Sequence, residues 1–253
     1  MKQPYPGTSW VAHASPAAAP QITLLCFPFA GGGATFFREW GRWLGPEIEV
    51  WPIEYPGRWS RMREPLCVDA VDLAERALLG LGERLPPRFA VLGHSMGALV
   101  AFEFVRALRR RGARLPERLI ASSRKAPHAA LAGPPLHELD DERMISTIAA
   151  RYGGLDPRLL QEPELMAMLA PILRADLRVH EAYRHYEEPP LALPVLALGG
   201  RDDTRVSEQD LQDWSGVSTA AFSLEMHPGG HFHLEKRSEA LGRQLRAALL
   251  SGE

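Results

Sequence analysis

The most informative segment of the chain is Phe89-Ala90-Val91-Leu92-Gly93-His94-Ser95-Met96-Gly97-Ala98. Its first four residues indicate a buried strand, and the apolar spacing from Leu99 to Leu108 indicates a helix directly after the turn. Gly-x-Ser-x-Gly carries weight only on such a strand-to-helix turn, where the residues two before and two after the serine must be small. Gly93 and Gly97 meet that demand, so the turn should lift the Ser95 hydroxyl above the sheet edge. The alternative is a glycine-rich turn with an idle serine.

Apolar runs and helical patterns alternate along the rest of the chain. We interpret six runs as strands: Ile22 to Phe27, Glu49 to Ile53, Phe89 to Leu92, Leu119 to Ser122, Val195 to Leu198 and Phe222 to Met226. The first, third and fifth are nearly continuous in Val, Leu, Ile and Ala, which is typical of strands that helices cover on both faces. The pattern predicts an α/β fold with right-handed crossovers and one central, mostly parallel sheet.

One long stretch interrupts this alternation. From Leu131 to His185 no strand is indicated, although helical patterns run from Asp141 to Tyr152 and from Pro163 to Tyr186. Roughly 55 residues without a strand are too many for an ordinary connection. We therefore expect an inserted helical lid at 131–185; the alternative is a set of peripheral crossover helices.

Length and composition restrict the class of protein. With 253 residues, 45% of them hydrophobic, we expect one domain at 21–253 after a flexible Pro- and Ala-rich segment at 1–20. No segment resembles a signal-peptide core or approaches the roughly 18 apolar residues of a membrane span, so a soluble, cytoplasmic protein is expected. The formal net charge of -2 argues against nucleic-acid binding. Cys26 and Cys67 lack zinc-ligand or redox spacing and are expected to be reduced thiols.

A serine turn of this kind needs a base and an acid. A serine hydroxyl is a poor nucleophile until an imidazole takes its proton. In folds with a serine turn of this kind, the acid and then the histidine follow the serine along the chain. The fifth strand ends near Asp203 and Asp202, either of which could be the acid or a turn-forming residue. His231 follows two glycines after the last strand and is preferred as the base over His227 and His233. No acid or cysteine joins these histidines at ligand spacing, so no metal is expected.

The glycine-rich loop from Phe27 to Gly33 follows the first strand and should supply half of an oxyanion hole. The amides of Ala30 and Met96 would point two donors at a developing oxyanion. Three consecutive glycines can also suggest phosphate binding, but no Gly-Lys-Ser/Thr follows, so the nucleotide interpretation is weak.

Six motifs occur in one order along the chain: Cys26 to Gly33, Tyr55 to Arg58, Gly93 to Ala98, Arg124 to Pro127, Gly199 to Asp203 and Pro228 to Phe232. Together they resemble the type II thioesterases, free-standing editing hydrolases of polyketide and nonribosomal peptide synthases with the α/β-hydrolase fold. The resemblance runs from Ile22 to the C-terminus and includes the expected lid, where Pro163 to Leu165 and Leu173 to Asp176 look like family features.

The resemblance implies Ser95, Asp203 and His231 as the catalytic triad and Ala30 and Met96 as the oxyanion amides. Thr204 departs from the family pattern, because members commonly carry proline after the acid, and this keeps Asp202 in consideration.

The implied reaction is acyl transfer from the phosphopantetheine arm of an acyl or peptidyl carrier protein to the serine, followed by attack of water. It needs no cofactor, and we expect a monomer. Because carrier proteins are typically acidic, basic residues should surround the mouth of the site. Arg109 to Arg111 is a candidate, although cations at a helix end are favoured by the helix dipole alone. A small-molecule carboxylesterase and a non-catalytic binding module are the rival functions.

Overall fold

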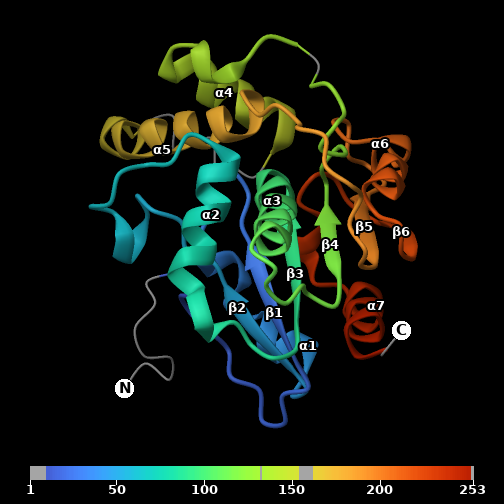
Figure 1. Ribbon diagram of the computed structural model, residues 1–253. Coiled ribbons are helices and arrows are strands. Elements are labelled where there is room, and N and C mark those ends of the chain that lie inside the picture. Colours follow the sequence, from blue (N-terminus) through green and yellow to red (C-terminus); the bar gives the residue numbers. More distant parts are fainter. Residues whose placement is uncertain (1–9, 132, 154–161, 252–253) are drawn as a thin grey trace.

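The computed structural model describes residues 10–131, 133–153 and 162–251 (Figure 1). Six strands form one sheet in the order β2-β1-β3-β4-β5-β6, and every neighbouring pair is parallel. The strands are β1 (Ile22–Phe27), β2 (Ile48–Pro52), β3 (Phe89–His94), β4 (Leu119–Ser122), β5 (Val195–Gly200) and β6 (Phe222–His227). The chain first adds β2 on one side of β1 and then β3 on the other. Ligands of open α/β sheets bind beyond the carboxyl ends of the strands at such a reversal.

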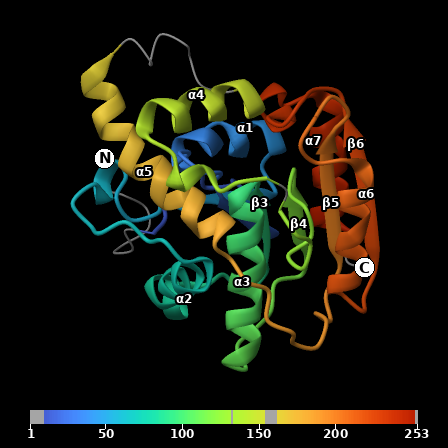
Figure 2. The same ribbon diagram turned by 90° about the horizontal axis from the view of Figure 1, so that it is seen from above.

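Helices cover both faces of the sheet (Figures 1 and 2). The helices are α1 (Trp40–Leu44), α2 (Ala70–Leu81), α3 (Met96–Arg110), α4 (Asp141–Tyr152), α5 (Pro163–Glu181), α6 (Glu208–Gln212) and α7 (Glu239–Leu250). Alternate strand residues enter two separate cores. Leu25 and Val91 pack with α2 and α3, whereas Leu24 and Leu92 pack with α1 and α7. The predicted fold, a mostly parallel sheet between helices, is confirmed.

Strands β3 and β5 run further at their carboxyl ends than the sequence patterns indicated, whereas β2 is shifted by one residue, from the expected Glu49 to Ile53 to Ile48–Pro52. β3 continues through Gly93 and His94, and β5 continues through Gly199 and Gly200. These glycines resemble turn residues in the sequence, but they are needed for close packing. A Cβ atom on Gly200 would lie 2.2 Å from the Gly230 carbonyl oxygen, a backbone atom that cannot move aside, which explains a glycine inside a strand.

Helices α4 and α5 lie across the carboxyl ends of the strands (Figures 1 and 2). They share a small apolar core of their own, distinct from the two cores of the sheet. The described residues between 131 and 185 contain no strand, and α5 ends at Glu181 rather than near Tyr186. This is the place where the inserted lid is expected; residues 132 and 154–161 of that segment lie outside the described residues.

The N-terminal segment differs from the expectation. Residues 1–9 lie outside the described residues, but Trp10 is only 6% exposed and packs in the core that contains α2 and α3. Val11 and Ser15 form antiparallel bridges to Ile53 and Val50, so the chain runs along the edge strand β2. The expected flexible segment at 1–20 therefore does not fit residues 10–15, which contact the sheet. The Pro- and Ala-rich composition suggested no apolar contact, but the buried Trp10 supplies one.

Within the described part of the chain, no helix combines the length and the apolar character that a membrane crossing requires.

Candidate active site

Ser95 occupies the turn between β3 and α3 in a strained backbone conformation, with φ of 54° and ψ of -118°. Non-glycine residues rarely adopt such angles, and the strain costs about 1–3 kcal/mol. The surrounding packing enforces the turn. A Cβ atom on Gly93 would lie 2.1 Å from the Gly97 carbonyl oxygen, and one on Gly97 would lie 2.1 Å from the Phe27 carbonyl oxygen. Both glycines are therefore sterically required.

Three loops at the carboxyl edge of the sheet bring Ser95, His231 and Asp203 together. His231 Nε2 lies 3.0 Å from Ser95 Oγ, and His231 Nδ1 lies 2.8 Å from Asp203 Oδ2. The serine follows β3, the acid follows β5 and the histidine follows β6. The arrangement has the geometry by which a base removes a serine proton while a carboxylate orients the base.

The surroundings of Asp203 favour its charged form. Its Oδ1 atom accepts the backbone amides of Arg205 at 2.8 Å and Val206 at 3.2 Å. Burial works against ionisation, but the hydrogen bond and charge of His231, together with these amides, outweigh it and hold the pKa of Asp203 below its usual value. The side chain of Asp202 is exposed, and its backbone amide donates to the Gly229 carbonyl at 2.9 Å. Of the two acids, Asp203 is the one that contacts the histidine.

The two other histidines near the last strand, His227 and His233, are buried beside the loop that carries His231. Ser123 Oγ donates to the His231 carbonyl at 3.0 Å and lies 3.3 Å from His233 Nδ1. The rings of His227 and His233 stack at 5.9 Å. Burial, with smaller effects of His227 and His231, lowers the pKa of His233 to about 4. It is therefore neutral at physiological pH and suited to packing.

Among the described residues, no group of three or more His, Cys, Asp or Glu is placed to hold a metal ion.

Ala30 and Met96 line a small cavity of about 40 Å³ together with Ser95 and His231. Met96 is the first residue of α3, so its amide belongs to the donors at a helix N-terminus that have no partner within the helix. Ala30 lies in the loop after β1. Both predicted oxyanion residues thus lie beside the serine.

A larger cavity of about 890 Å³ opens from the same serine toward α4 and α5. The ring of Tyr152, at the end of α4, packs 4.9 Å from the His231 ring. Basic residues also line this cavity, among them Lys125, Arg151, Arg184 and Arg205. The volume lies within the range of small-molecule binding sites in proteins.

Arg124 also lines the larger cavity, although the sequence analysis did not place it in the site. Its side chain is buried and contacts His180 Nδ1, and burial lowers the pKa of Arg124 to about 10. It therefore stays charged at neutral pH. The Arg124 to Pro127 motif was the only signal for it in the sequence.

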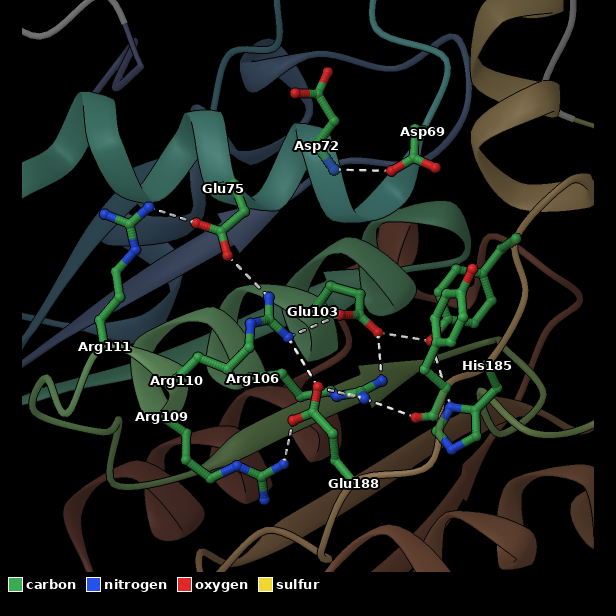
Figure 3. Close-up of polar contacts among 12 residues, drawn as sticks. Asp69, Asp72, Glu75, Glu103, Arg106, Arg109, Arg110, Arg111, His185 and Glu188 are labelled. Carbon is green, nitrogen blue, oxygen red and sulfur yellow. Dashed lines mark hydrogen bonds and ion pairs between the residues drawn. The ribbon is translucent and has the colours of Figure 1, made fainter.

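The arginines at 109–111 do not reach this cavity. They lie at the carboxyl end of α3, roughly 20 Å along the helix from Ser95. Figure 3 shows that Glu75 and Glu188 pair with their guanidinium groups, at distances of 2.6 to 3.0 Å. Glu188 also pairs with the buried Arg106, which ties the chain after α5 to α3. The arginine run closes a helix and anchors a loop, so it is not the basic surface at the mouth of the site.

Comparison with known proteins places the chain in a family. Residues 22–249 match the family model of the thioesterase domain. The gramicidin S biosynthesis protein GrsT of Aneurinibacillus migulanus is 36% identical over 95% of each chain. Thioesterase PikA5 of Streptomyces venezuelae is 36% identical over 89% of this chain and 80% of its own length.

Solved structures agree with these relatives. RedJ, a thioesterase from the prodiginine pathway of Streptomyces coelicolor, has a TM-score of 0.86 at 36% identity and covers 97% of this chain and 98% of its own. BorB, a type II thioesterase from the borrelidin biosynthetic cluster, has a TM-score of 0.83 at 33% identity over 95% and 96% of the two chains.

The fold and the site define a serine hydrolase of the α/β-hydrolase class. Within that class the chain belongs to the thioesterase family, as a relative of the type II thioesterases of polyketide and nonribosomal peptide pathways. The resemblance noted in the sequence is confirmed.

Proposed function

We propose that this protein removes acyl groups from the phosphopantetheine arm of a carrier protein, as an editing enzyme of a polyketide or nonribosomal peptide assembly line. The observation that carries the proposal is the continuous hydrogen-bonded series Ser95, His231 and Asp203 at the floor of a large cavity. The family match and the pathways named for GrsT, RedJ and BorB support the choice of substrate.

In the first half of the reaction Ser95 Oγ attacks the thioester carbonyl carbon, and His231 Nε2 takes the serine proton. The carbonyl oxygen becomes an oxyanion, which accepts hydrogen bonds from the amides of Ala30 and Met96. The carbon–sulfur bond then breaks. The pantetheine thiol leaves with the proton from His231, and the acyl group stays on Ser95 as an ester.

In the second half a water molecule attacks the acyl ester while His231 takes one of its protons. The same two amides accept the second oxyanion. When the ester bond breaks, His231 returns the proton to Ser95 Oγ, and the free acid departs. Asp203 holds the His231 Nδ1 proton throughout and stabilises the imidazolium that forms in each half.

The cavity supplies the binding site for the acyl chain. Helices α4 and α5 act as the lid: their shared apolar core keeps them together, and Tyr152, Leu173 and Leu177 face the serine.

The carrier docks at the open side of the cavity, where Arg151, Arg184 and Arg205 attract the acidic carrier and the phosphate of its arm. The protein acts as a monomer in the cytoplasm.

The test compares three substrates with one acyl chain: an acyl carrier protein, a free acyl thioester and the matched oxygen ester. We expect the highest kcat/KM for the carrier substrate and a loss of several orders of magnitude in Ser95→Ala, because triad residues act as a unit. A preference for the oxygen ester would establish a small-molecule esterase. Failure of Ser95 to react with a fluorophosphonate, together with no hydrolysis, would establish a binding module.

A further inference from the structure

One face of α5 is directed at the serine. Leu173, Leu177 and His180 follow helical spacing and line the small cavity beside Ser95. Asp176 lies on the same side of the helix and is only 2% exposed. A buried carboxylate beside an apolar substrate wall is costly to desolvate, so its partners indicate what it does there.

The partners of Asp176 lie in the loop that carries Ala30. Asp176 Oδ2 accepts the Gly31 backbone amide at 2.7 Å. The same oxygen accepts from the buried Arg58 guanidinium, which also donates to the Pro56 carbonyl at 3.1 Å. A lid helix thus contributes the charged acceptor for the amide directly after Ala30.

The loop is held on its other side as well. Tyr55 Oη donates to the Pro28 carbonyl at 3.2 Å, and the Arg58 guanidinium lies over the Tyr55 ring at 5.1 Å. Gly31 adopts a φ of +75°, and a Cβ atom there would lie 2.5 Å from Leu173 Cδ2. Helix α5 therefore packs directly against the loop, and the positive φ favours glycine at this position.

We propose that Asp176 is a positioning residue for the oxyanion loop, held in place by Arg58, and that it makes catalysis depend on how α5 is seated. The Ala30 amide lies in the Phe29–Ala30 peptide plane, whose carbonyl accepts the Gly32 amide at 2.9 Å. The planes before and after it are held by Tyr55 at the Pro28 carbonyl and by Asp176 at the Gly31 amide. Without the carboxylate the Ala30–Gly31 plane loses its anchor, the turn loosens, and the Ala30 amide turns away from the oxyanion. This inference rests on the proposed function and adds a residue from the lid to it.

Two variants separate positioning from bulk stability. Asp176→Leu removes every acceptor for the Gly31 amide, whereas Asp176→Asn keeps an oxygen that can accept it. Loss of an oxyanion donor costs about 10²–10³ in rate. We expect kcat to fall about 100-fold in Asp176→Leu and less than about tenfold in Asp176→Asn, with KM within about threefold of the parent in both.

Asp141→Asn is the matched control. It also removes a lid carboxylate that pairs with an arginine, here Arg174 at 2.6 Å, but on the exposed side of the lid. Its kcat should equal that of the parent.

The decisive readout compares two inhibitors with the same chain. A trifluoromethyl ketone forms a tetrahedral adduct with Ser95 whose oxyanion needs the Ala30 amide, whereas a thioether without a carbonyl only fills the cavity. We expect Asp176→Leu to weaken the ketone by about the same factor as kcat, with thioether affinity changed less than about threefold. Equal loss of both inhibitors, or a kcat within about threefold of the parent, would overturn the proposal.

If Asp176→Leu does not fold, Asp176→Asn carries the test with the same two inhibitors. A three- to tenfold selective loss of the ketone, of the order expected when a charged acceptor becomes neutral, supports the proposal, and equal losses overturn it. A parent enzyme that hydrolyses no thioester would refute the proposed function itself. A parent that hydrolyses normally beside unaffected Asp176 variants would refute only this inference.

Discussion

Asp203 Oδ2 lies 2.8 Å from His231 Nδ1, whereas the side chain of the adjacent Asp202 is exposed to solvent. Asp203→Asn should therefore lower kcat/KM by about 10⁴, because an amide cannot hold the required histidine tautomer. Asp202→Asn should change it less than about threefold. Steady-state hydrolysis of one acyl thioester by both variants checks this. The reverse order would move the acid by one residue, and small equal losses would place it elsewhere.

Helices α4 and α5 should open more readily than the sheet. They share a small apolar core that is separate from the cores of the sheet, and they lie across the carboxyl ends of the strands (Figure 1). Amide hydrogen exchange in α4 and in the first turns of α5 should be faster than in β3, and it should slow when an acyl-serine analogue occupies Ser95. Protection equal to that of β3, unchanged by the analogue, would exclude a lid.

The rate with the carrier substrate should depend on ionic strength and on the arginines at the mouth of the cavity. The kcat/KM for acyl carrier protein should fall between low and physiological ionic strength, while that for a small uncharged thioester stays nearly flat. Arg184→Gln, at the mouth, should lower the carrier rate at low salt by about two- to fivefold. Arg111→Gln removes the same charge at the far end of α3 and should not. Identical salt profiles for the two substrates would argue against electrostatic recognition.

Ionisation of the buried Glu54 should lower the free energy of unfolding as pH rises. The carboxyl group is buried, and burial outweighs the charges of Arg58 and Arg61, which raises the pKa of Glu54 to about 7. In the unfolded chain the carboxyl group ionises near its ordinary pKa of 4.5. Its stabilising contribution is therefore fully present below that value and is lost as pH rises toward and through 7, by on the order of 3 kcal/mol.

The variant Glu54→Gln removes this titration. Urea unfolding at pH 5 and pH 8.5 should show a decrease in the free energy of unfolding that is smaller in the variant than in the parent. Parallel pH dependence in the two proteins would show that Glu54 is not the group responsible.

Local patterns in the sequence are sufficient to predict the serine turn and the order of the site residues along the chain. A continuous apolar strand, two glycines that frame a serine and an amphipathic helix are local patterns, and local sterics leave few structures for them. The positions of Ser95 and His231 follow from this, since each lies in the loop or turn that follows a strand and all parallel strands end at the same edge.

The other features depend on contacts between distant segments. Which of Asp202 and Asp203 contacts His231 depends on how the loops after β5 and β6 meet. Glu75 and Glu188, from other parts of the chain, form ion pairs with the arginines at 109–111. Trp10 packs into the core and holds a Pro- and Ala-rich segment whose composition did not predict order. The contact of Asp176 with Gly31 joins residues 145 positions apart. No periodicity encodes such pairs, because a hydrogen bond or an ion pair is set by distances between side chains that only the packed chain brings together.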